Sequence, residues 1–264
     1  MFAGKTVWIT GASSGIGEAT AYEMAAEGAL LILSARREEE LERVKATCVA
    51  NGASADNIMV LALDVIDEAA MPAIVAKAEA FTGRIDMLFN NAGISQRSLC
   101  VDTDMATYRK LFEVDVFGQI ALTKLVLPIM LKQGSGHMAV TASVAGKIGV
   151  KFRTGYCAAK HAMMGFFDAL RAEVAHQGIF VTTVTPGYIR TAISTNALKG
   201  DGSKFGKVDK NIGAGMDVTA CAKVIMRGFK AGKPEIPVGE GMEMKALWVK
   251  RFFPNKLFKM VENI

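Results

Sequence analysis

The residues with the clearest chemical potential are a tyrosine and a lysine four positions apart, Tyr156 and Lys160. Four residues make about one helical turn, so in a helix the two side chains share a face. A free phenol ionises only near pH ~10, and a neighbouring ammonium group favours its charged form. Ser143 precedes them and ends an apolar run, where its hydroxyl could donate to the same substrate oxygen. Together these groups could pass a proton to or from an alcohol or carbonyl oxygen.

Tyrosine and lysine at this spacing are also common on solvated helices, so the surrounding elements must support the chemistry. Short apolar runs without polar alternation are typical of strands covered on both faces, and stretches with helical spacing separate them. This alternation predicts an α/β, doubly wound fold with one parallel sheet and helices on both of its faces. The predicted strands are 6–10, 30–33, 58–63, 87–89, 137–141 and 179–184, and the predicted helices are 18–27, 38–49, 69–80, 108–131 and 154–175.

The composition is that of an ordinary globular chain of 264 residues, with 51% hydrophobic and 22% charged residues. It excludes collagen-like and disordered classes. The four cysteines form no CxxC pair and the three histidines have no metal-ligand spacing, so we expect no metal site. We expect neither a cleaved leader nor a membrane-spanning segment, and a cytoplasmic location.

A glycine-rich loop follows the first predicted strand, with Gly11, Gly15 and Gly17 at its turns. The first glycine permits a tight turn, the second lets backbone approach a pyrophosphate, and the third lets the following helix sit close to the strand. The N–H groups of that helix would then face phosphate. A strand, this loop and a helix at the start of a βαβ unit are the context that dinucleotide binding requires. The loop residues expected at the cofactor are Gly11, Ser13, Ser14, Gly15, Ile16 and Gly17.

The second predicted strand leads into two arginines, Arg36 and Arg37, where enzymes that prefer NAD commonly place an acid. Guanidinium groups bind phosphate well, so the cofactor is predicted to be NADP. Alternatively, the arginines are solvated charges paired with the acidic residues 38–40. Asp64, followed by Val65, ends the third strand. Its carboxylate would either bind the adenine amino group or cap a following helix.

Several motifs occur in the order and spacing of the short-chain dehydrogenase/reductase family, which the chain resembles over residues 4–240. They are the glycine loop Thr10–Gly17, the segment Asn90–Gly93 (NNAG), the serine segment Thr141–Ser143, the pair Tyr156 and Lys160, and the segment Pro186–Thr191. The resemblance implies hydride exchange with a nicotinamide cofactor. It makes Tyr156 the acid/base, Ser143 the donor to the substrate oxygen, and Lys160 the ribose ligand that favours the phenolate. It adds Asn91, Ala92, Gly93, Pro186, Ile189 and Thr191 to the cofactor site, beside Tyr156 and Lys160.

Asp115 departs from this pattern, because the family usually has asparagine at the corresponding place in the long helix. By resemblance, that asparagine helps to hold a water linking the active-site lysine to solvent. An aspartate adds a negative charge near Lys160. Asp115 is therefore either part of the catalytic group or a plain helix residue.

Two segments are expected to serve the substrate and partners. The Gly- and Lys-containing loop over residues 194–215 is predicted to close over the substrate with Ala197, Leu198 and Phe205, hinged at its glycines. Residues 195–264 hold 13 basic and 7 acidic side chains, and residues 241–264 add aromatic rings among lysines. We divide the chain into a catalytic domain, 1–240, and this basic aromatic extension, 241–264, which Pro254 splits into two helices. The extension covers a partner subunit or the substrate, touches anionic lipid, or is simply solvated.

The favoured function is an NADP(H)-dependent oxidoreductase that interconverts a ketone or aldehyde and an alcohol. The tail resembles the hydroxysteroid-dehydrogenase-like branch, which implies a lipophilic substrate, and the family implies a homodimer or homotetramer. The alternative is a nucleotide-sensing or scaffold protein of the same fold with little turnover. Sugar-nucleotide epimerases have longer chains, and no nucleic-acid-binding module is evident, so we expect no nucleic-acid partner.

Overall fold

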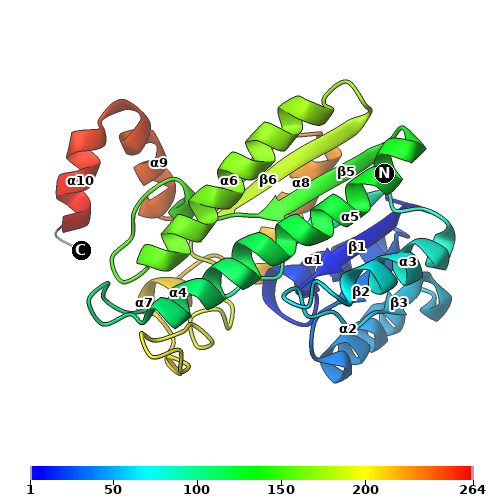
Figure 1. Cartoon of the computed structure of the whole chain (residues 1–264), viewed down its shortest axis with the longest axis horizontal. Coiled ribbons are helices and arrows are strands. Elements are labelled where there is room, and N and C mark those ends of the chain that lie inside the picture. Colours follow the sequence, from blue (N-terminus) through cyan, green and yellow to red (C-terminus); the bar gives the residue numbers. More distant parts are fainter. Residues whose placement is uncertain (1, 263–264) are drawn as a thin grey trace.

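The computed structural model describes residues 2–262 and has one seven-stranded parallel sheet at its centre (Figure 1). The strand order is β3-β2-β1-β4-β5-β6-β7. The first strands are added on one side of β1 and the later strands on its other side, so the order of connection reverses between β1 and β4. In such sheets, ligands bind beyond the carboxyl ends of the strands at this reversal. The strands are β1 (Thr6–Thr10), β2 (Leu30–Ser34), β3 (Ile58–Val60), β4 (Met87–Asn90), β5 (Gly136–Thr141), β6 (Ile179–Pro186) and β7 (Glu235–Val238).

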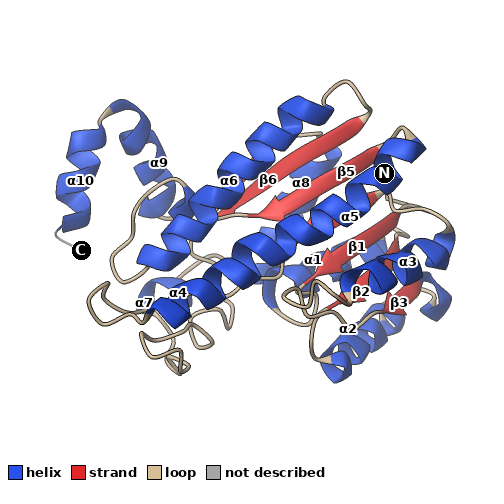
Figure 2. Cartoon of the chain, in the orientation of Figure 1, coloured by secondary structure: helices blue, strands red, loops and turns tan. Residues whose placement is uncertain are grey.

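Helices cover both faces of this sheet, which confirms the predicted doubly wound fold (Figure 2). One core lies between the sheet and α1, α2 and α8, and a second lies between the sheet and α3, α5 and α6. Because side chains alternate along each strand, Val7 and Ile9 enter the first core while Trp8 enters the second. The helices are α1 (Gly15–Ala26), α2 (Glu38–Ala50), α3 (Met71–Thr82), α4 (Met105–Phe112), α5 (Gly118–Gln133), α6 (Thr154–Val174), α7 (Lys210–Gly213), α8 (Val218–Lys230), α9 (Met242–Phe252) and α10 (Pro254–Glu262).

The structure differs from the predicted elements in several places. The single helix expected over 108–131 is α4 and α5 joined by a π turn, Glu113–Phe117. The strand expected over 58–63 ends at Val60, although the N–H groups of Leu61 and Leu63 still bond to the backbone of the β2 region. The helices α7 and α8 and the seventh strand were not predicted, and β7 has no continuous apolar run because Glu235 and Pro237 interrupt it.

The helical segment Met105–Gln133 is long enough to span a membrane, and its most apolar 18-residue stretch has a mean hydropathy of 1.6. Half of its most apolar window is buried inside the protein. Leu122, Val126 and Met130 of α5 belong to the core on the α3, α5 and α6 face of the sheet. This packing accounts for the apolar character of the helix.

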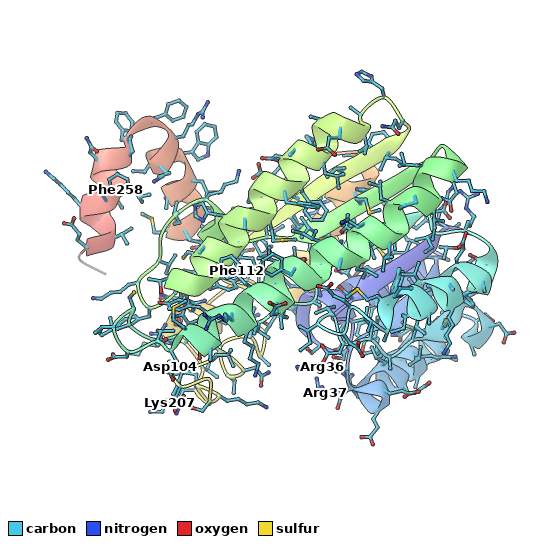
Figure 3. All side chains as sticks on the ribbon, in the orientation of Figure 1. Arg36, Arg37, Asp104, Phe112, Lys207 and Phe258 are labelled. Carbon is cyan, nitrogen blue, oxygen red and sulfur yellow. The ribbon has the colours of Figure 1, made fainter. Side chains whose placement is uncertain are left out.

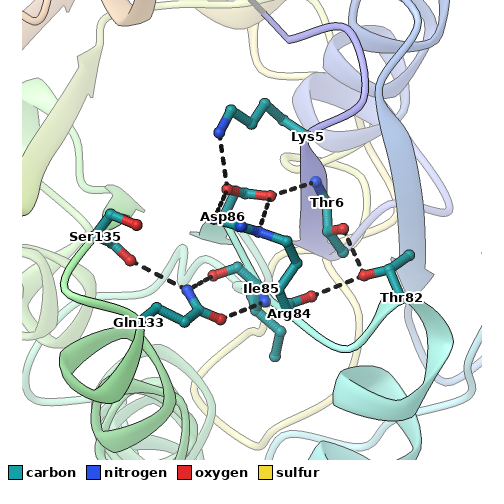
Figure 4. Close-up of polar contacts among 8 residues, drawn as sticks. All are labelled: Lys5, Thr6, Thr82, Arg84, Ile85, Asp86, Gln133 and Ser135. Carbon is teal, nitrogen blue, oxygen red and sulfur yellow. Dashed lines mark hydrogen bonds and ion pairs between the residues drawn. The ribbon is translucent and has the colours of Figure 1, made fainter.

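The amino-terminal edge of the sheet is closed by a polar network around Asp86 (Figure 4). The Asp86 carboxylate accepts hydrogen bonds from the Thr6 N–H at 2.9 Å and from the Arg84 guanidinium, and it pairs with Lys5. Burial alone would raise the pKa of Asp86, but these donors hold it below its ordinary value. The network joins β1 to the start of β4 at the end of the sheet opposite the glycine loop.

The C-terminal extension forms a helical hairpin that stands beside the body at the left of Figure 1. Pro254 is the first residue of α10, a position where its missing N–H costs no helical bond. Leu257 and Leu247 pack with Ile148 and Val150 of the body in a small separate core. The predicted extension 241–264 is thus a docked hairpin as far as Glu262, and its last two residues lie outside the described part, as does Met1.

We predict that Gly118→Ala destabilises the protein, because a methyl group at Gly118 would overlap the carbonyl oxygen of Val65. Overpacking of this kind costs roughly 1–3 kcal/mol. The matched control is Gly165→Ala in α6, where a methyl group meets no heavy atom within 4 Å. That change should leave stability equal or raise it by up to about 1 kcal/mol, through the helix preference of alanine. Urea denaturation of both variants checks the prediction, and equal midpoints would contradict it.

Candidate active site

The glycine loop connects β1 to α1 and lies against the end of β4. Gly11 and Gly15 have positive φ angles of 65° and 60°, a conformation that favours glycine. A methyl group on Gly17 would lie 2.5 Å from both the Gly11 carbonyl oxygen and the Asn91 amide nitrogen. Gly17 therefore allows α1 to approach the strand ends as closely as it does.

The start of α1 is suited to phosphate. Ser14 occupies the N-cap position but its side chain caps no backbone N–H. The first turn of a helix leaves N–H groups without intrahelical partners, and its dipole favours an anion there. Gly15 adds space, since a methyl group on it would reach only the Thr191 side chain, at 3.3 Å. Ser13 is buried at the loop and Ile16 lines the adjoining cavity.

Arg36 and Arg37 lie just beyond β2, at the edge of the sheet where the glycine loop ends, and both are exposed (Figure 3). The expected alternative was that they pair with the acids 38–40. The structure instead pairs Glu40 with Arg43, at 2.8 Å, and Arg43 also pairs with Glu18. Among the described residues neither Arg36 nor Arg37 has an ion-pair partner within 4 Å.

The NNAG segment at the end of β4 joins neighbouring strands. Asn91 donates to the Thr10 carbonyl at 3.1 Å and accepts from the Thr141 hydroxyl at 2.9 Å. The Thr10 hydroxyl in turn accepts from the N–H groups of Asn91 and Ala92. Asn91 was predicted at the cofactor, and here its side chain is engaged in holding β1, β4 and β5 together. A methyl group on Gly93 would lie 3.4 Å from the Lys160 amine, so this backbone lies next to the lysine.

Asp64 and Val65 lie in the turn after β3. The Asp64 carboxylate accepts from the Ile66 N–H at 3.3 Å, which is a local turn interaction. Asp67, rather than Asp64, accepts from the Ala70 N–H at the start of α3. Val65 is buried and its carbonyl oxygen faces Gly118.

A cavity of about 720 Å³, counting its open mouth, lies at the carboxyl ends of β5 and β6. Both Ser143 and Tyr156 line it, together with apolar side chains. Ser143 caps a short helical turn and accepts from the Ala145 N–H at 3.1 Å. No hydrogen bond joins the Tyr156 hydroxyl to another described residue, so the hydroxyl is available in the cavity. The apolar lining includes Ile16, Val144, Ile148, Val150, Ile189, Ile193 and Ile212.

Lys160 lies behind this cavity with its ammonium group almost fully buried. It donates to the Thr141 carbonyl at 3.1 Å and lies 3.3 Å from the Asp115 carboxylate. The ammonium nitrogen is 5.7 Å from the centre of the Tyr156 ring, as expected for residues one turn apart. The structure thus brings Ser143, two residues after β5, into one region with Tyr156 and Lys160 of α6.

Asp115 belongs to the π turn between α4 and α5 and is fully buried. One carboxylate oxygen accepts from the Ile94 N–H at 2.7 Å, and the other faces Lys160. Burial raises the pKa of Asp115, against the attraction of Lys160. Burial alone would lower the pKa of Lys160, but the charge of Asp115 raises it above its ordinary value. Asp115 is therefore the buried counter-ion of Lys160, and its participation in catalysis stays a prediction.

The segment after β6 presents its backbone to the cavity. Arg190 and Tyr188 exchange backbone hydrogen bonds with Met216, at 2.9 Å each. In a parallel bridge this leaves the N–H and carbonyl of the intervening Ile189 on the opposite side, toward the cavity that Ile189 lines. Pro186 ends β6, and its carbonyl accepts from the Ser143 hydroxyl at 3.4 Å.

The loop over residues 194–215 is anchored along part of its length. Ala197 and Leu198, predicted to lie over the substrate, are buried instead, and Leu198 forms backbone hydrogen bonds with the 95–97 segment. The Phe205 ring contacts the Arg97 guanidinium. Ile193 and Ile212 are the nearby residues that line the cavity.

Two charged residues that the sequence reasoning missed also line the cavity, Arg153 and Glu243. Arg153 precedes Tyr156 by nearly one helical turn, a spacing that could have identified it. Glu243 comes from α9, and its carboxylate accepts from the N–H groups of Tyr188 and Gly241. No sequence signal connects Glu243 to the site, because docking of the hairpin brings it there.

The fold and this arrangement agree with comparisons to known proteins. The family model described as short chain dehydrogenase matches residues 5–202. A Drosophila melanogaster protein named dehydrogenase/reductase SDR family protein 7-like is 42% identical over 97% of this chain and 78% of its own. The human dehydrogenase/reductase SDR family member 7 is 40% identical over 94% of this chain and 74% of its own. The chain belongs to the short-chain dehydrogenase/reductase family and is an oxidoreductase of that class.

A solved structure shares the fold across nearly the whole chain. It is a short-chain dehydrogenase/reductase from Burkholderia phymatum in complex with NAD, with a TM-score of 0.83 and 24% identity. The match covers 98% of this chain and 95% of that one. The fold of residues 2–262 is therefore that of the family.

We predict that Asp115→Ala destabilises the protein by roughly 3 kcal/mol or more, because it leaves the buried Lys160 ammonium without its counter-ion. The control is Asp168→Ala, which breaks the more exposed pair of Asp168 with Arg171 and should cost less than about 1 kcal/mol. Equilibrium urea unfolding at neutral pH measures both. Equal losses of unfolding free energy in the two variants would show that the buried Asp115–Lys160 pair stabilises the protein no more than the exposed pair.

Proposed function

We propose that the protein is an NADP(H)-dependent carbonyl reductase, which also oxidises the corresponding alcohol, acting on lipophilic substrates. The observation that carries the proposal is the apolar cavity in which Ser143 and Tyr156 meet, with Lys160 buried behind Tyr156. We further propose a cytoplasmic homodimer or homotetramer. Sedimentation velocity tests the oligomeric state, and a monomer at micromolar concentration would reject it.

The residues present fit a dinucleotide. Gly15 leaves room beside Thr191, and the first turn of α1 has N–H groups that Ser14 does not cap. These groups would hold the pyrophosphate, while the Ile189 backbone and the Thr191 hydroxyl would hold the carboxamide. When bound, the nicotinamide supplies or accepts the hydride.

The protein's own residues manage the proton. Tyr156 donates its phenolic proton to the carbonyl oxygen during reduction. During oxidation its phenolate accepts the hydroxyl proton of the alcohol. Ser143 leaves its weak bond with the Pro186 carbonyl and donates to the same substrate oxygen. Lys160 stays charged and favours the phenolate, while Asp115 and the Thr141 carbonyl keep the ammonium in place.

Preference for NADP rests on Arg36 and Arg37. They are exposed at the end of β2 and unpaired among the described residues, so both guanidinium groups are available for a 2′-phosphate. The apolar cavity lining supports a lipophilic substrate. A nucleotide-binding scaffold without turnover is the competing proposal, favoured only by the extra charge of Asp115. NADPH oxidation with a panel of lipophilic ketones and aldehydes separates the two.

Tyr156→Phe is expected to reduce turnover by about 10²–10⁴-fold, since it removes the proton donor while keeping the ring. NADPH affinity should stay within about twofold of wild type, measured by nucleotide fluorescence, since only the hydroxyl is lost. Near-normal turnover of the variant would reject the role of Tyr156.

Arg36→Asp and Arg37→Asp, made separately, are expected to lower the NADPH-over-NADH ratio of kcat/KM by at least about tenfold at the arginine that holds the phosphate. Arg227→Asp, an exposed arginine on α8, is the control and should leave the ratio unchanged. If neither variant at 36 or 37 moves the ratio, the predicted cofactor preference is wrong.

Asp115→Asn keeps an oxygen for the Ile94 N–H and removes the negative charge opposite Lys160. The ammonium then acts on Tyr156 undiminished, which favours the phenolate. Because alcohol oxidation needs the phenolate as base, its pH–rate midpoint should move to lower pH, by about one unit or less. The pH–rate profiles of both enzymes measure this. A midpoint that stays or rises would show that Asp115 does not weaken the effect of Lys160 on Tyr156.

A further inference from the structure

A buried guanidinium group faces the substrate cavity without enough partners. Arg153 is 8% exposed, and its two hydrogen bonds, to the Ser95 hydroxyl and the Asp209 carboxylate, are both long at 3.4 Å. A guanidinium has five N–H donors, and these two long bonds engage only two of them. The others are available to a ligand in the cavity that Arg153 lines.

Asp209 does not neutralise Arg153 alone. The same carboxylate oxygen is held more closely by Arg97, and the other oxygen accepts from the N–H groups of Asn211 and Ile212. Two guanidinium groups therefore share one carboxylate, which leaves one positive charge in excess. Arg97 is partly exposed, whereas the Arg153 side chain is nine-tenths buried.

The backbone before Arg153 is strained into place. Phe152 has a φ of 66°, the only positive φ of a non-glycine residue among residues 2–262. Its carbonyl accepts from the Ser98 N–H at 3.0 Å and its ring packs under the Arg97 guanidinium. Such a conformation persists only where its surroundings enforce it, and it often marks a functional site. It directs the chain into α6 so that Arg153 enters the cavity three residues before Tyr156.

We propose that Arg153 binds a carboxylate carried by the carbonyl substrate. A carboxylate offers two oxygens to a guanidinium fork and neutralises the excess charge. Arg153 is the only cation among the residues that line the cavity, and most of the other lining side chains are apolar or uncharged. The one anion, the Glu243 carboxylate, already accepts from backbone N–H groups at the α9 end. The substrate class is thus a lipophilic oxo acid, an inference that rests on the proposed carbonyl reduction.

The test compares medium-chain oxo-carboxylates with their methyl esters, using NADPH. Arg153→Met should raise KM for the carboxylate by at least about tenfold and change KM for the ester by less than about twofold. Arg153→Lys should recover part of the difference. The control is Arg97→Met, which removes the other partner of Asp209 but does not line the cavity. Equal effects on acid and ester, or the same pattern in Arg97→Met, would overturn the proposal.

A binding measurement separates this proposal from the proposed function. Calorimetric titration of the NADPH-loaded enzyme with the oxo-carboxylate should show binding to wild type that is at least about tenfold weaker in Arg153→Met. Such binding without turnover of acid or ester would reject the carbonyl reductase but support Arg153. Turnover of the ester with no preference for the acid would support the carbonyl reductase and reject the role of Arg153.

A different feature, the tip of the C-terminal hairpin, has an unusual surface. The rings of Trp248, Phe252, Phe253 and Phe258 are 51–68% exposed. Trp248 stacks on Phe252 with ring centres 5.8 Å apart, and the Lys250 ammonium lies 4.4 Å from the centre of the Phe258 ring. Figure 3 shows Phe258 on the hairpin, apart from the body. We call these four rings with Lys250, Arg251 and Lys256 the aromatic tip.

The charge of the aromatic tip indicates what covers it. Arg251 and Lys256 are exposed at the turn of the hairpin, and the acid of α9, Glu243, lies at its base in the substrate cavity. A symmetric contact with a second copy would bring basic groups together. An anionic lipid surface matches both the exposed rings and the positive charge of the aromatic tip. The rings would insert among the headgroups, and the basic side chains would contact anionic phosphates.

We also infer that the aromatic tip binds an anionic lipid surface. The inner side of the hairpin packs on Ile148 and Val150, which line the cavity, so a bound bilayer would lie close to the substrate site. The proposed lipid contact therefore lies at the same end of the molecule as the cavity.

Tryptophan fluorescence reports on this contact directly, since Trp248 is exposed and the only other tryptophan, Trp8, is fully buried. Vesicles of phosphatidylcholine with phosphatidylserine should sediment the protein and shift its emission to the blue, with weaker binding at high salt. Phe252→Ser/Phe253→Ser should weaken binding at least about tenfold. The control is Phe180→Ser, which removes a ring 64% exposed on β6 and should leave binding unchanged.

Absence of sedimentation and of an emission shift in wild type would overturn the lipid proposal. So would equal binding of the Phe252→Ser/Phe253→Ser variant. A dimer that this variant breaks in sedimentation velocity, without any vesicle binding, would show instead that a second copy covers the tip.

Discussion

The buried ammonium group of Lys160 is the constraint around which the catalytic end of the molecule is organised. A charge removed from water must be paired and hydrogen-bonded, or folding would not tolerate it. Its partners come from separate parts of the chain, the Thr141 carbonyl at the end of β5 and Asp115 in the π turn. The backbone at Gly93, after β4, lies beside both charged groups. One side chain thereby joins β4, β5, α6 and the long helix at the place where Tyr156 meets the cavity.

The π turn is where this constraint changes the helix itself. A regular helix over 105–133 would not have the extra residue that the turn accommodates, and Asp115 lies within that turn. The same carboxylate holds the Ile94 N–H, so it supports the backbone beyond the NNAG segment as well as the lysine. Where the family usually has an uncharged amide, this chain has a charge, and the pair with Lys160 compensates it within the protein.

The cavity shows how separate parts of the chain share one site. Body residues after Ser143 form its apolar wall, and the same residues anchor the C-terminal hairpin. Glu243 reaches the cavity only because α9 docks there, and its carboxylate bonds the backbone at Tyr188. Arg153 enters from the start of α6, beside the strained Phe152. The cavity is therefore lined mainly by residues of the second half of the chain, whereas the glycine loop and the two arginines after β2 lie in the first half.

By itself, the sequence determined the order of the first six strands and of the helices between them, the glycine loop and the Tyr156–Lys160 pair. Those features depend on local spacing, which a helix or strand converts directly into geometry. The tertiary structure alone decided that Asn91 joins strands, that Leu198 is buried, and that Arg153 and Glu243 line the cavity. Each of these depends on contacts between residues distant in the chain, and the burial of a polar group is a property of its surroundings rather than of its neighbours in sequence.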